Sequence, residues 1–276
     1  MRPSRITALL LHSLCSTPDE FLLVQSELHR AGHGARALRV PGYSFDGAAT
    51  SANRQSHQAW VRTVLQQVRE EAVAGRRVVL VGLSAGAALA LGATLTSPGL
   101  VAGLVLMSTT LNFDGWAVPG YGRLVALPLY TPLGRFWSYR ERPPFGVKNP
   151  RVRDWVQDQL RKRREACAGA AVISVAHLRE FDRLRRLVRR QLSAFACPPV
   201  LALHAQEDDV ASPDNVRLLR ERLRTSSFRS VLLHDSHHMI TIDNDRLQVA
   251  RETVDFVDAL AFKTSATATP RQGARP

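Results

Sequence analysis

The chain of 276 residues is predicted to be an α/β protein with a doubly wound, mostly parallel sheet. Short apolar runs alternate along the sequence with segments of helical periodicity, which is typical of parallel strands connected by helices. One run leads directly into the pentapeptide Gly82-Leu83-Ser84-Ala85-Gly86, and an Ala/Leu-rich helical segment follows it. The alternation stops between about residues 111 and 197, which predicts a helical lid inserted into the sheet domain.

Most of the strands are predicted from apolar runs that are too continuous for half-exposed strands and too short for helices. In chain order, the strands are expected at Ile6–Leu11, Ala35–Val40, Val78–Val81, Leu100–Ser108, Val200–His204 and Ser230–Leu233. Open sheets of this kind bind ligands beyond the carboxyl ends of their strands. The loops that follow the strands are therefore the places to look for functional residues.

The helices are predicted from apolar residues at helical spacing and from residues that begin or end helices. Pro18 opens the first helix and Gly32 closes it, while Gly75 closes a second helix at 56–74. The helix after the pentapeptide ends before Pro98. The remaining helices are expected at Arg151–Cys167, Val175–Phe195, Pro213–Leu223 and Asp245–Leu260.

We expect three parts along the chain. Residues 1–110 and 198–262 form the sheet core, and residues 111–197 form the lid. Because the lid sequence is too long for a loop, it is expected to lie over the carboxyl ends of the strands. The segment 263–276 is rich in Thr, Ala, Pro and Arg and is expected to be a disordered tail.

The lid sequence is rich in aromatic and basic residues. The aromatic residues either line an acyl pocket or form the core of the lid itself; they are Phe113, Trp116, Tyr121, Tyr130, Phe136, Trp137, Tyr139 and Phe145. Between residues 134 and 193 there are sixteen lysines or arginines and six acidic residues, so most of the net charge of +13 lies on the lid. This surface is either simply solvated or attracts an anionic lipid or an acidic acyl carrier. Nucleic acid is not expected, because no nucleic-acid-binding motif accompanies the charge.

Composition narrows the class of protein further. No apolar stretch approaches the roughly 18 residues that a membrane-spanning helix needs. Arg2 and Arg5 before an apolar run resemble the start of a signal peptide, but His12 ends that run early, and we interpret it as the first strand. Three cysteines without a paired motif suit a reducing compartment, so a cytoplasmic protein is expected. No metal-binding or nucleotide-binding pattern is present, and no cofactor is expected.

The pentapeptide is typical of a nucleophile elbow, a sharp turn that presents a serine between a strand and a helix. Gly82 and Gly86 are required because a side chain at either position would clash with the neighbouring helix or strand. Ser84 is then exposed at the tip of the turn as a nucleophile. The backbone amide of Ala85 opens the helix and is expected to face a developing oxyanion.

Two later loops carry the residue types that a serine nucleophile needs. Asp208 and Asp209 follow the strand that ends at His204, and His237 and His238 follow the last strand. A histidine would take the proton of the serine, and an acid would orient the histidine and stabilise its charged form. The residues alone do not decide which member of each pair acts.

These pieces resemble the α/β-hydrolases, in the branch of carboxylesterases, monoacylglycerol lipases and S33-type serine aminopeptidases. The resemblance covers nearly the whole chain outside the lid and the tail. It is carried by five pieces: Leu9–His12, Gln58–Trp60, Gly82–Gly86, the run from Asp208 to Asp214, and Ser236–Asp243. It implies that Asp208 is the acid, that His238 is the base, and that the amides of Leu14 and Ala85 form the oxyanion hole.

The sequence departs from the family pattern at two positions. The family usually has His-Gly after its first strand, and this chain has His12-Ser13. A left-handed conformation at Ser13 would cost of order 1 kcal/mol or more and would disturb the oxyanion hole. The glycine usually found before the base is replaced by His237.

The resemblance implies a serine hydrolase that cleaves carboxylic esters of short to medium acyl chains through an acyl-enzyme. Two alternatives remain open at this point. An acyl thioesterase or acyltransferase would use the same triad, and a protein with the same fold but no catalysis would serve as a binding module. A small-molecule acyl ester is the expected partner.

Overall fold

The computed structural model describes residues 6–45, 55–118, 129–131, 138–163, 165–166 and 169–267. Its main sheet has six strands, all paired in parallel, in the order β12-β10-β4-β3-β1-β2. In chain order the strands are β1 (Ile6–Leu11), β2 (Gly34–Ala37), β3 (Arg77–Leu83), β4 (Val101–Met107), β10 (Val200–Ala205) and β12 (Phe228–Leu233). The predicted doubly wound α/β fold is confirmed.

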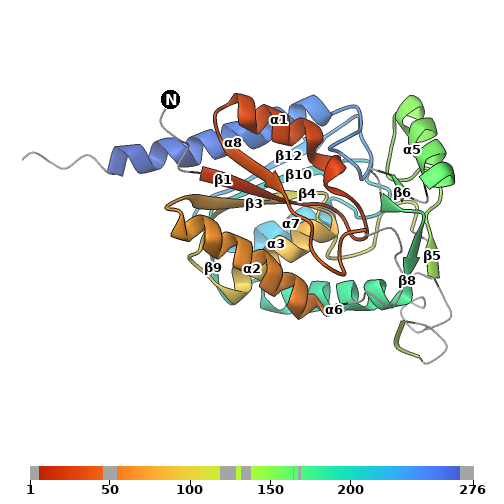
Figure 1. Cartoon of the computed structure of the whole chain (residues 1–276), viewed down its shortest axis with the longest axis horizontal. Coiled ribbons are helices and arrows are strands. Elements are labelled where there is room, and N and C mark those ends of the chain that lie inside the picture. The colour runs from red at the N-terminus through yellow and green to blue at the C-terminus, as the bar shows by residue number, and fades with distance from the viewer. Residues whose placement is uncertain are drawn as a thin grey trace, which may run out of the picture.

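Helices cover both faces of this sheet (Figure 1). One face is covered by α1 (Leu22–Arg30), which follows the 3₁₀ turn η1 (Pro18–Phe21), and by α8 (Arg246–Thr267). The other face is covered by α2 (His57–Val73), α3 (Ala85–Thr96), α6 (Val175–Gln191) and α7 (Asp214–Arg222). The two apolar cores lie on either side of the sheet, because each buried strand contributes side chains to both faces.

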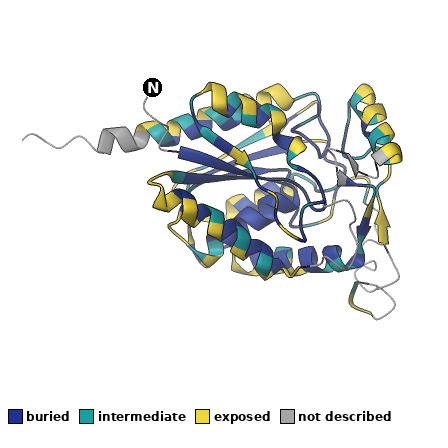
Figure 2. Cartoon of the chain, in the orientation of Figure 1, coloured by how far each residue is buried: buried dark blue, intermediate teal, exposed yellow. Residues whose placement is uncertain are grey.

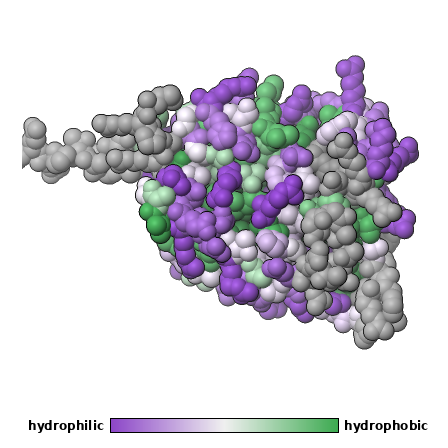
Figure 3. All heavy atoms as spheres, in the orientation of Figure 1, coloured by the Kyte–Doolittle hydropathy of each residue, from purple (hydrophilic) through white to green (hydrophobic). Residues whose placement is uncertain are grey.

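Burial follows the amphipathic patterns of the sequence (Figure 2). All residues of β1 and β10 are buried, whereas the surface helices alternate between buried and exposed positions. The second helix begins at the cap residue Ser56, whose side chain accepts a hydrogen bond from the Ala59 amide, and ends just before Gly75 at φ +74°. On the face seen in Figure 3, hydrophilic residues cover most of the described surface.

The described part of the expected lid divides into two regions. The first contains β5 (Ser138–Arg140), α5 (Pro150–Arg163), β6 (Glu165–Ala166), β7 (Gly169–Ala170) and β8 (Val172–Ser174). These elements lie at one end of the molecule, with β5 paired to β8 and β6 to β7, both antiparallel (Figure 1). The helix expected to reach Cys167 ends at Arg163, because the chain then turns into the β6–β7 pair.

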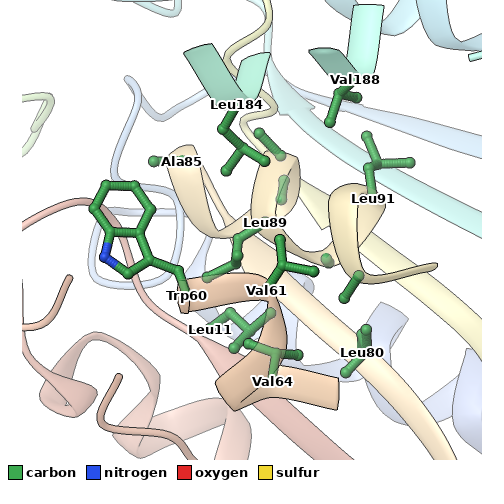
Figure 4. Packing of buried hydrophobic residues seen from close by; sticks show 14 of the residues in the cluster. Leu11, Trp60, Val61, Val64, Leu80, Ala85, Leu89, Leu91, Leu184 and Val188 are labelled. Carbon is green, nitrogen blue, oxygen red and sulfur yellow. The ribbon is translucent and has the colours of Figure 1, made fainter. Parts of the chain in front are cut away.

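The second region is α6, which falls within the expected lid bounds of 111–197 and packs against the helices of the sheet domain. Its apolar stripe of Phe181, Leu184, Val188 and Leu192 contributes to the same core as α2 and α3. Figure 4 shows Leu184 and Val188 directed toward the residues of these helices. A Cβ on Gly92 of α3 would lie 2.9 Å from Leu184 Cδ1, so the two helices approach closely there. The apolar stripe of α6 therefore faces the sheet core.

The ends of the chain add two details. The helix α8 continues to Thr267, so the first residues of the expected tail at 263–276 are helical, and residues 268–276 lie outside the described residues. Short strands β9 (Ala196–Cys197) and β11 (Arg224–Thr225) form a separate parallel pair. No helix among the described residues has the length and apolar character needed to span a bilayer.

Candidate active site

Ser84 lies in the turn between β3 and α3, in a backbone conformation that L-residues rarely adopt. Its φ is 56° and its ψ is −116°, and its amide donates to the carbonyl of Met107 at 2.8 Å. A Cβ on Gly82 would lie 2.4 Å from the backbone of Gly86, which explains why the turn needs glycine. Such strain is retained where the surrounding structure enforces it, and the turn therefore presents the Ser84 hydroxyl at the end of the sheet.

The N-terminus of α3 presses against the carboxyl end of β1. A Cβ on Gly86 would lie 2.0 Å from the carbonyl oxygen of Leu11 and 2.6 Å from that of His12. This contact brings the amides of Leu14 and Ala85 onto neighbouring segments. Within the described part of the chain, neither amide donates a hydrogen bond to a protein acceptor. Amides without a protein acceptor suit an oxygen that gains negative charge, as the resemblance implies for these two.

A hydrogen-bonded chain links Ser84, His238 and Asp208. The Ser84 hydroxyl lies 2.8 Å from His238 Nε2, and His238 Nδ1 lies 2.9 Å from both carboxylate oxygens of Asp208. With Nδ1 protonated, the ring donates to Asp208 and its Nε2 accepts from the serine. All three side chains are buried, and they come from loops at the carboxyl ends of β3, β10 and β12.

The buried acid and base stabilise each other electrostatically. Burial disfavours the charged form of His238, but Asp208, aided by Asp209 and Glu141, outweighs burial and raises its pKa. Burial also disfavours the carboxylate of Asp208, yet its pKa is lowered because His238 and His204 lie beside it. The pair is thus arranged to stabilise a charged imidazole.

The structure separates the two members of each ambiguous pair. The ring of His237 lies against Trp116, with the two ring centroids 5.4 Å apart, and the His237 amide donates to the carboxylate of Asp243. Asp209 does not contact the His238 ring through a hydrogen bond among the described contacts, and instead accepts from the His238 amide at 3.2 Å. Asp208 and His238 are therefore the pair that reaches Ser84.

The loop that carries His238 is held by the segment between β5 and α5. The Met239 amide donates to the carbonyl of Gly146 at 2.7 Å, and a Cβ on Gly146 would lie 3.1 Å from that of His238. The buried carboxylate of Asp243 accepts from the amides of Lys148 and His237, at 2.7 and 2.9 Å. These contacts fix the base from a part of the chain that the sequence analysis assigned to the lid.

The concern about strain at Ser13 does not apply to this structure. The described non-glycine residues with positive φ do not include Ser13, and the left-handed position in this loop is Cys15, at φ 53°. His12 organises the loop, because its ring contacts Ser13 O at 2.7 Å and Ser44 Oγ at 2.7 Å. Burial lowers the pKa of His12 to about 4, so this ring is neutral.

Two polar residues at the site were missed by the sequence analysis. Thr110 Oγ1 lies 3.2 Å from Ser84 Oγ, and the carboxyl group of Glu20 accepts from the amide of Ser13 at 2.8 Å. Thr110 follows β4, whose carboxyl end lies at the same edge as the serine, so its position was a usable signal. Glu20 gave no comparable signal, because it reads as an ordinary acidic residue in a first helical turn.

The aromatic residues expected in the lid have different surroundings. Tyr121, Phe136 and Trp137 lie outside the described residues. Phe113 packs edge-on against Phe181 of α6, with ring centroids 5.9 Å apart, and the Trp116 indole donates to Glu207 O. Among the described residues, no group of three His, Cys, Asp or Glu side chains could hold a metal ion.

Comparisons with known proteins agree with this architecture. The chain is 20% identical over 251 residues to the thermostable monoacylglycerol lipase of Bacillus sp. (strain H-257), covering 91% of this chain and 90% of that protein. The structure of Paleococcus ferrophilus monoacylglycerol lipase matches with a TM-score of 0.73 and 20% identity, over 94% of this chain and 96% of that one. A soluble variant of monoglyceride lipase from Saccharomyces cerevisiae matches with a TM-score of 0.76 and 13% identity, over 94% and 88%.

The pattern that defines the alpha/beta hydrolase family matches residues 8–252, which include the elbow, both candidate acids and both candidate bases. Because this match spans most of the sequence, the chain belongs to the alpha/beta hydrolase family.

Proposed function

We propose that this protein is a serine hydrolase that cleaves carboxylic esters through Ser84, His238 and Asp208. The observation that carries the proposal is the continuous hydrogen-bonded chain from the Ser84 hydroxyl through both ring nitrogens of His238 to Asp208. That arrangement supplies a nucleophile, a base and an orienting acid in the order that acyl transfer requires.

The proposed reaction proceeds in two halves. The Ser84 hydroxyl gives its proton to His238 Nε2 while Oγ attacks the acyl carbon, and the amides of Leu14 and Ala85 stabilise the resulting oxyanion. His238 then protonates the departing alcohol, which leaves an ester between the acyl group and Ser84. Water, deprotonated by His238, hydrolyses this acyl-enzyme and restores the serine. Asp208 stays ionised throughout, and no step uses a cofactor.

The substrate class is inferred from the relatives. Proteins named as monoacylglycerol lipases are similar to this chain over nine-tenths of their length, which supports an ester of a single acyl chain. We propose short to medium acyl chains. The segment between β5 and α5, which contacts the His238 loop, is proposed to bound the site as part of a lid.

We propose separately that the basic surface of the lid, between residues 134 and 193, contacts a peripheral partner. Several arginines of α6 pair with acids of the same helix, since Arg183 contacts Glu180 and both Arg185 and Arg186 contact Asp182. Recruitment to an anionic lipid or an acidic acyl carrier would depend on the remaining cations. Vesicle binding that falls steeply with salt would support such recruitment, and binding that ignores ionic strength would contradict it.

Labelling by a fluorophosphonate probe tests the proposed chemistry. We expect covalent labelling of the wild type and none of Ser84→Ala, together with hydrolysis of p-nitrophenyl esters by the wild type only. A panel of matched esters, thioesters and acyl acceptors then separates ester hydrolysis from thioester hydrolysis and acyl transfer. A folded wild-type protein that is neither labelled nor active on any of them would overturn the proposal in favour of a binding module.

A further inference from the structure

A buried carboxyl group contacts the loop between β1 and η1. Glu20 is 1% exposed, and it accepts hydrogen bonds from both the amide of Ser13, at 2.8 Å, and the hydroxyl of Ser13. A buried acid is costly unless polar partners compensate for lost water. Both of these partners belong to the residue just before Leu14, whose amide is one of the two proposed oxyanion donors.

The hydrogen bonds of this loop fix the orientation of consecutive peptide groups. The carbonyl of His12 accepts from the Tyr43 hydroxyl at 2.5 Å, and the amide of the same peptide group donates to Glu20. Because a peptide group is planar, this unit is held at both ends. In the next peptide group, between Ser13 and Leu14, the Ser13 carbonyl oxygen contacts the His12 ring. The amide of a trans peptide points opposite to its carbonyl, so the Leu14 amide faces away from that ring.

We propose that Glu20 is a positioning residue for the oxyanion hole. By holding the amide and the hydroxyl of Ser13, it keeps the Leu14 amide directed at the oxygen of the bound acyl group. The inference rests on the proposed function, because such a hole has a role only in acyl transfer. Ser13, which departs from the His-Gly pattern, supplies the hydroxyl that gives Glu20 its second anchor.

The electrostatics of Glu20 are compatible with a site that stabilises negative charge. Burial raises the pKa of Glu20 to about 7, although the hydrogen bonds from Ser13 and the proximity of His238 lower it. The carboxyl group is therefore only partly ionised near neutral pH, which reduces its repulsion of an oxyanion. A protonated carboxyl group still has an acceptor oxygen for the Ser13 amide.

The test compares Glu20→Gln with the wild type. Glutamine keeps the size of the side chain but places a donor group against one of the two Ser13 donors. For each variant, kcat and KM are measured with a p-nitrophenyl ester, and the inhibition constant is measured for a trifluoromethyl ketone with the same acyl chain. The ketone forms a tetrahedral adduct with the serine, so its affinity reports on the oxyanion hole. Glu71→Gln is the matched control, since Glu71 is a buried acid paired with Arg76 at the far end of α2.

We expect Glu20→Gln to lower kcat about tenfold and to raise the inhibition constant of the ketone about tenfold. KM should stay within about twofold of the wild-type value, because only transition-state binding is lost. Glu71→Gln should leave all three values unchanged. Ketone affinity within twofold of wild type, or a loss that appears equally in KM, would overturn the inference. Thermal unfolding shows whether Glu20→Gln is folded.

Ser13→Ala provides a second variant if Glu20→Gln does not fold. It removes the hydroxyl that contacts Glu20 and keeps the Ser13 amide. Because one of the two hydrogen bonds to Glu20 remains, the inhibition constant of the ketone should rise only about threefold, at constant KM. An unchanged ketone affinity would overturn the inference. A wild-type enzyme that is labelled and active while these variants behave normally contradicts only the role of Glu20, whereas an unlabelled wild type contradicts the proposed function itself.

Discussion

The two sides of the candidate site are held in place by different means. The Ser84 side is fixed by backbone contacts of one turn, in which Gly82 meets Gly86 and Gly86 meets the end of β1. The His238 side is fixed by side chains and loops from distant parts of the sequence, since His238 meets Asp208 and its loop is held by Gly146 and Asp243.

This difference suggests how each side responds to substitution. Backbone atoms in van der Waals contact cannot move apart without moving a strand or a helix, so substitutions on the Ser84 side should lower the free energy of unfolding. The His238 side depends on hydrogen bonds whose loss moves one ring, so errors there should cost activity first. Four predictions test this contrast.

The largest expected effect is that of His238→Ala compared with His237→Ala. Loss of the base should lower kcat by about 10⁵-fold, with little change in the free energy of unfolding. The His237 ring lies against Trp116 and away from Ser84, so His237→Ala should reduce kcat by less than about tenfold. Steady-state kinetics and urea unfolding measure both values. Equal losses of kcat in the two variants would contradict the assignment of His238, and not His237, as the base.

Asp208→Asn should lower kcat by about 10⁴-fold, since the orienting acid is lost. The base must be neutral to act, so the wild-type rate falls as the pH drops through the pKa of His238. Because Asp208 raises that pKa, Asp208→Asn should shift this acid limb to lower pH. The matched variant Asp209→Asn keeps an acceptor oxygen for the His238 amide and removes only a charge that raises the His238 pKa less than Asp208 does, so it should be much less affected. A pH profile of kcat that does not move in Asp208→Asn argues against the assignment.

Gly86→Ala and Gly146→Ala compare the two sides directly. A Cβ on Gly86 would lie 2.0 Å from the Leu11 carbonyl oxygen, so we expect a loss of more than about 3 kcal/mol in the free energy of unfolding. A Cβ on Gly146, at φ +69°, would lie 2.8 Å from the flexible Met239 side chain, and about 1–2 kcal/mol is expected there. Urea unfolding measures both changes. Wild-type stability in Gly86→Ala would contradict a rigid elbow.

The smallest effect is expected for Asp243→Asn. The carboxylate accepts backbone hydrogen bonds from Lys148, Asn149 and His237, and an amide offers only one acceptor oxygen. We expect a loss of about 1–2 kcal/mol in stability and a few-fold lower kcat. A loss of stability without any loss of kcat would show that this carboxylate supports the fold and not the position of the base.

The fold and the nucleophile could be read from the sequence because their signals are local. Apolar runs predicted the six strands, although β2 occupies Gly34–Ala37 and the expected strand was Ala35–Val40. The glycines of the pentapeptide predicted the elbow, since a side chain at Gly82 would meet the backbone of Gly86 and a side chain at Gly86 would meet the end of β1. Helical spacing also predicted a helix at Val175–Phe195, which the structure has as α6 at Val175–Gln191, but not that it packs on α2 and α3.

By itself, the sequence determined the sheet, the elbow and the presence of an acid and a base in the right loops, because strand periodicity and the spacing of the two elbow glycines are local patterns in the chain. The residues alone left both pairs open and the family resemblance implied Asp208 and His238, whereas the hydrogen bonds that join these two side chains to Ser84 are visible only in the tertiary structure. The tertiary structure also decided that Ser13 avoids strain and that Glu20 and Asp243 hold the loops. These outcomes depend on hydrogen bonds between segments far apart in sequence, which no local pattern encodes.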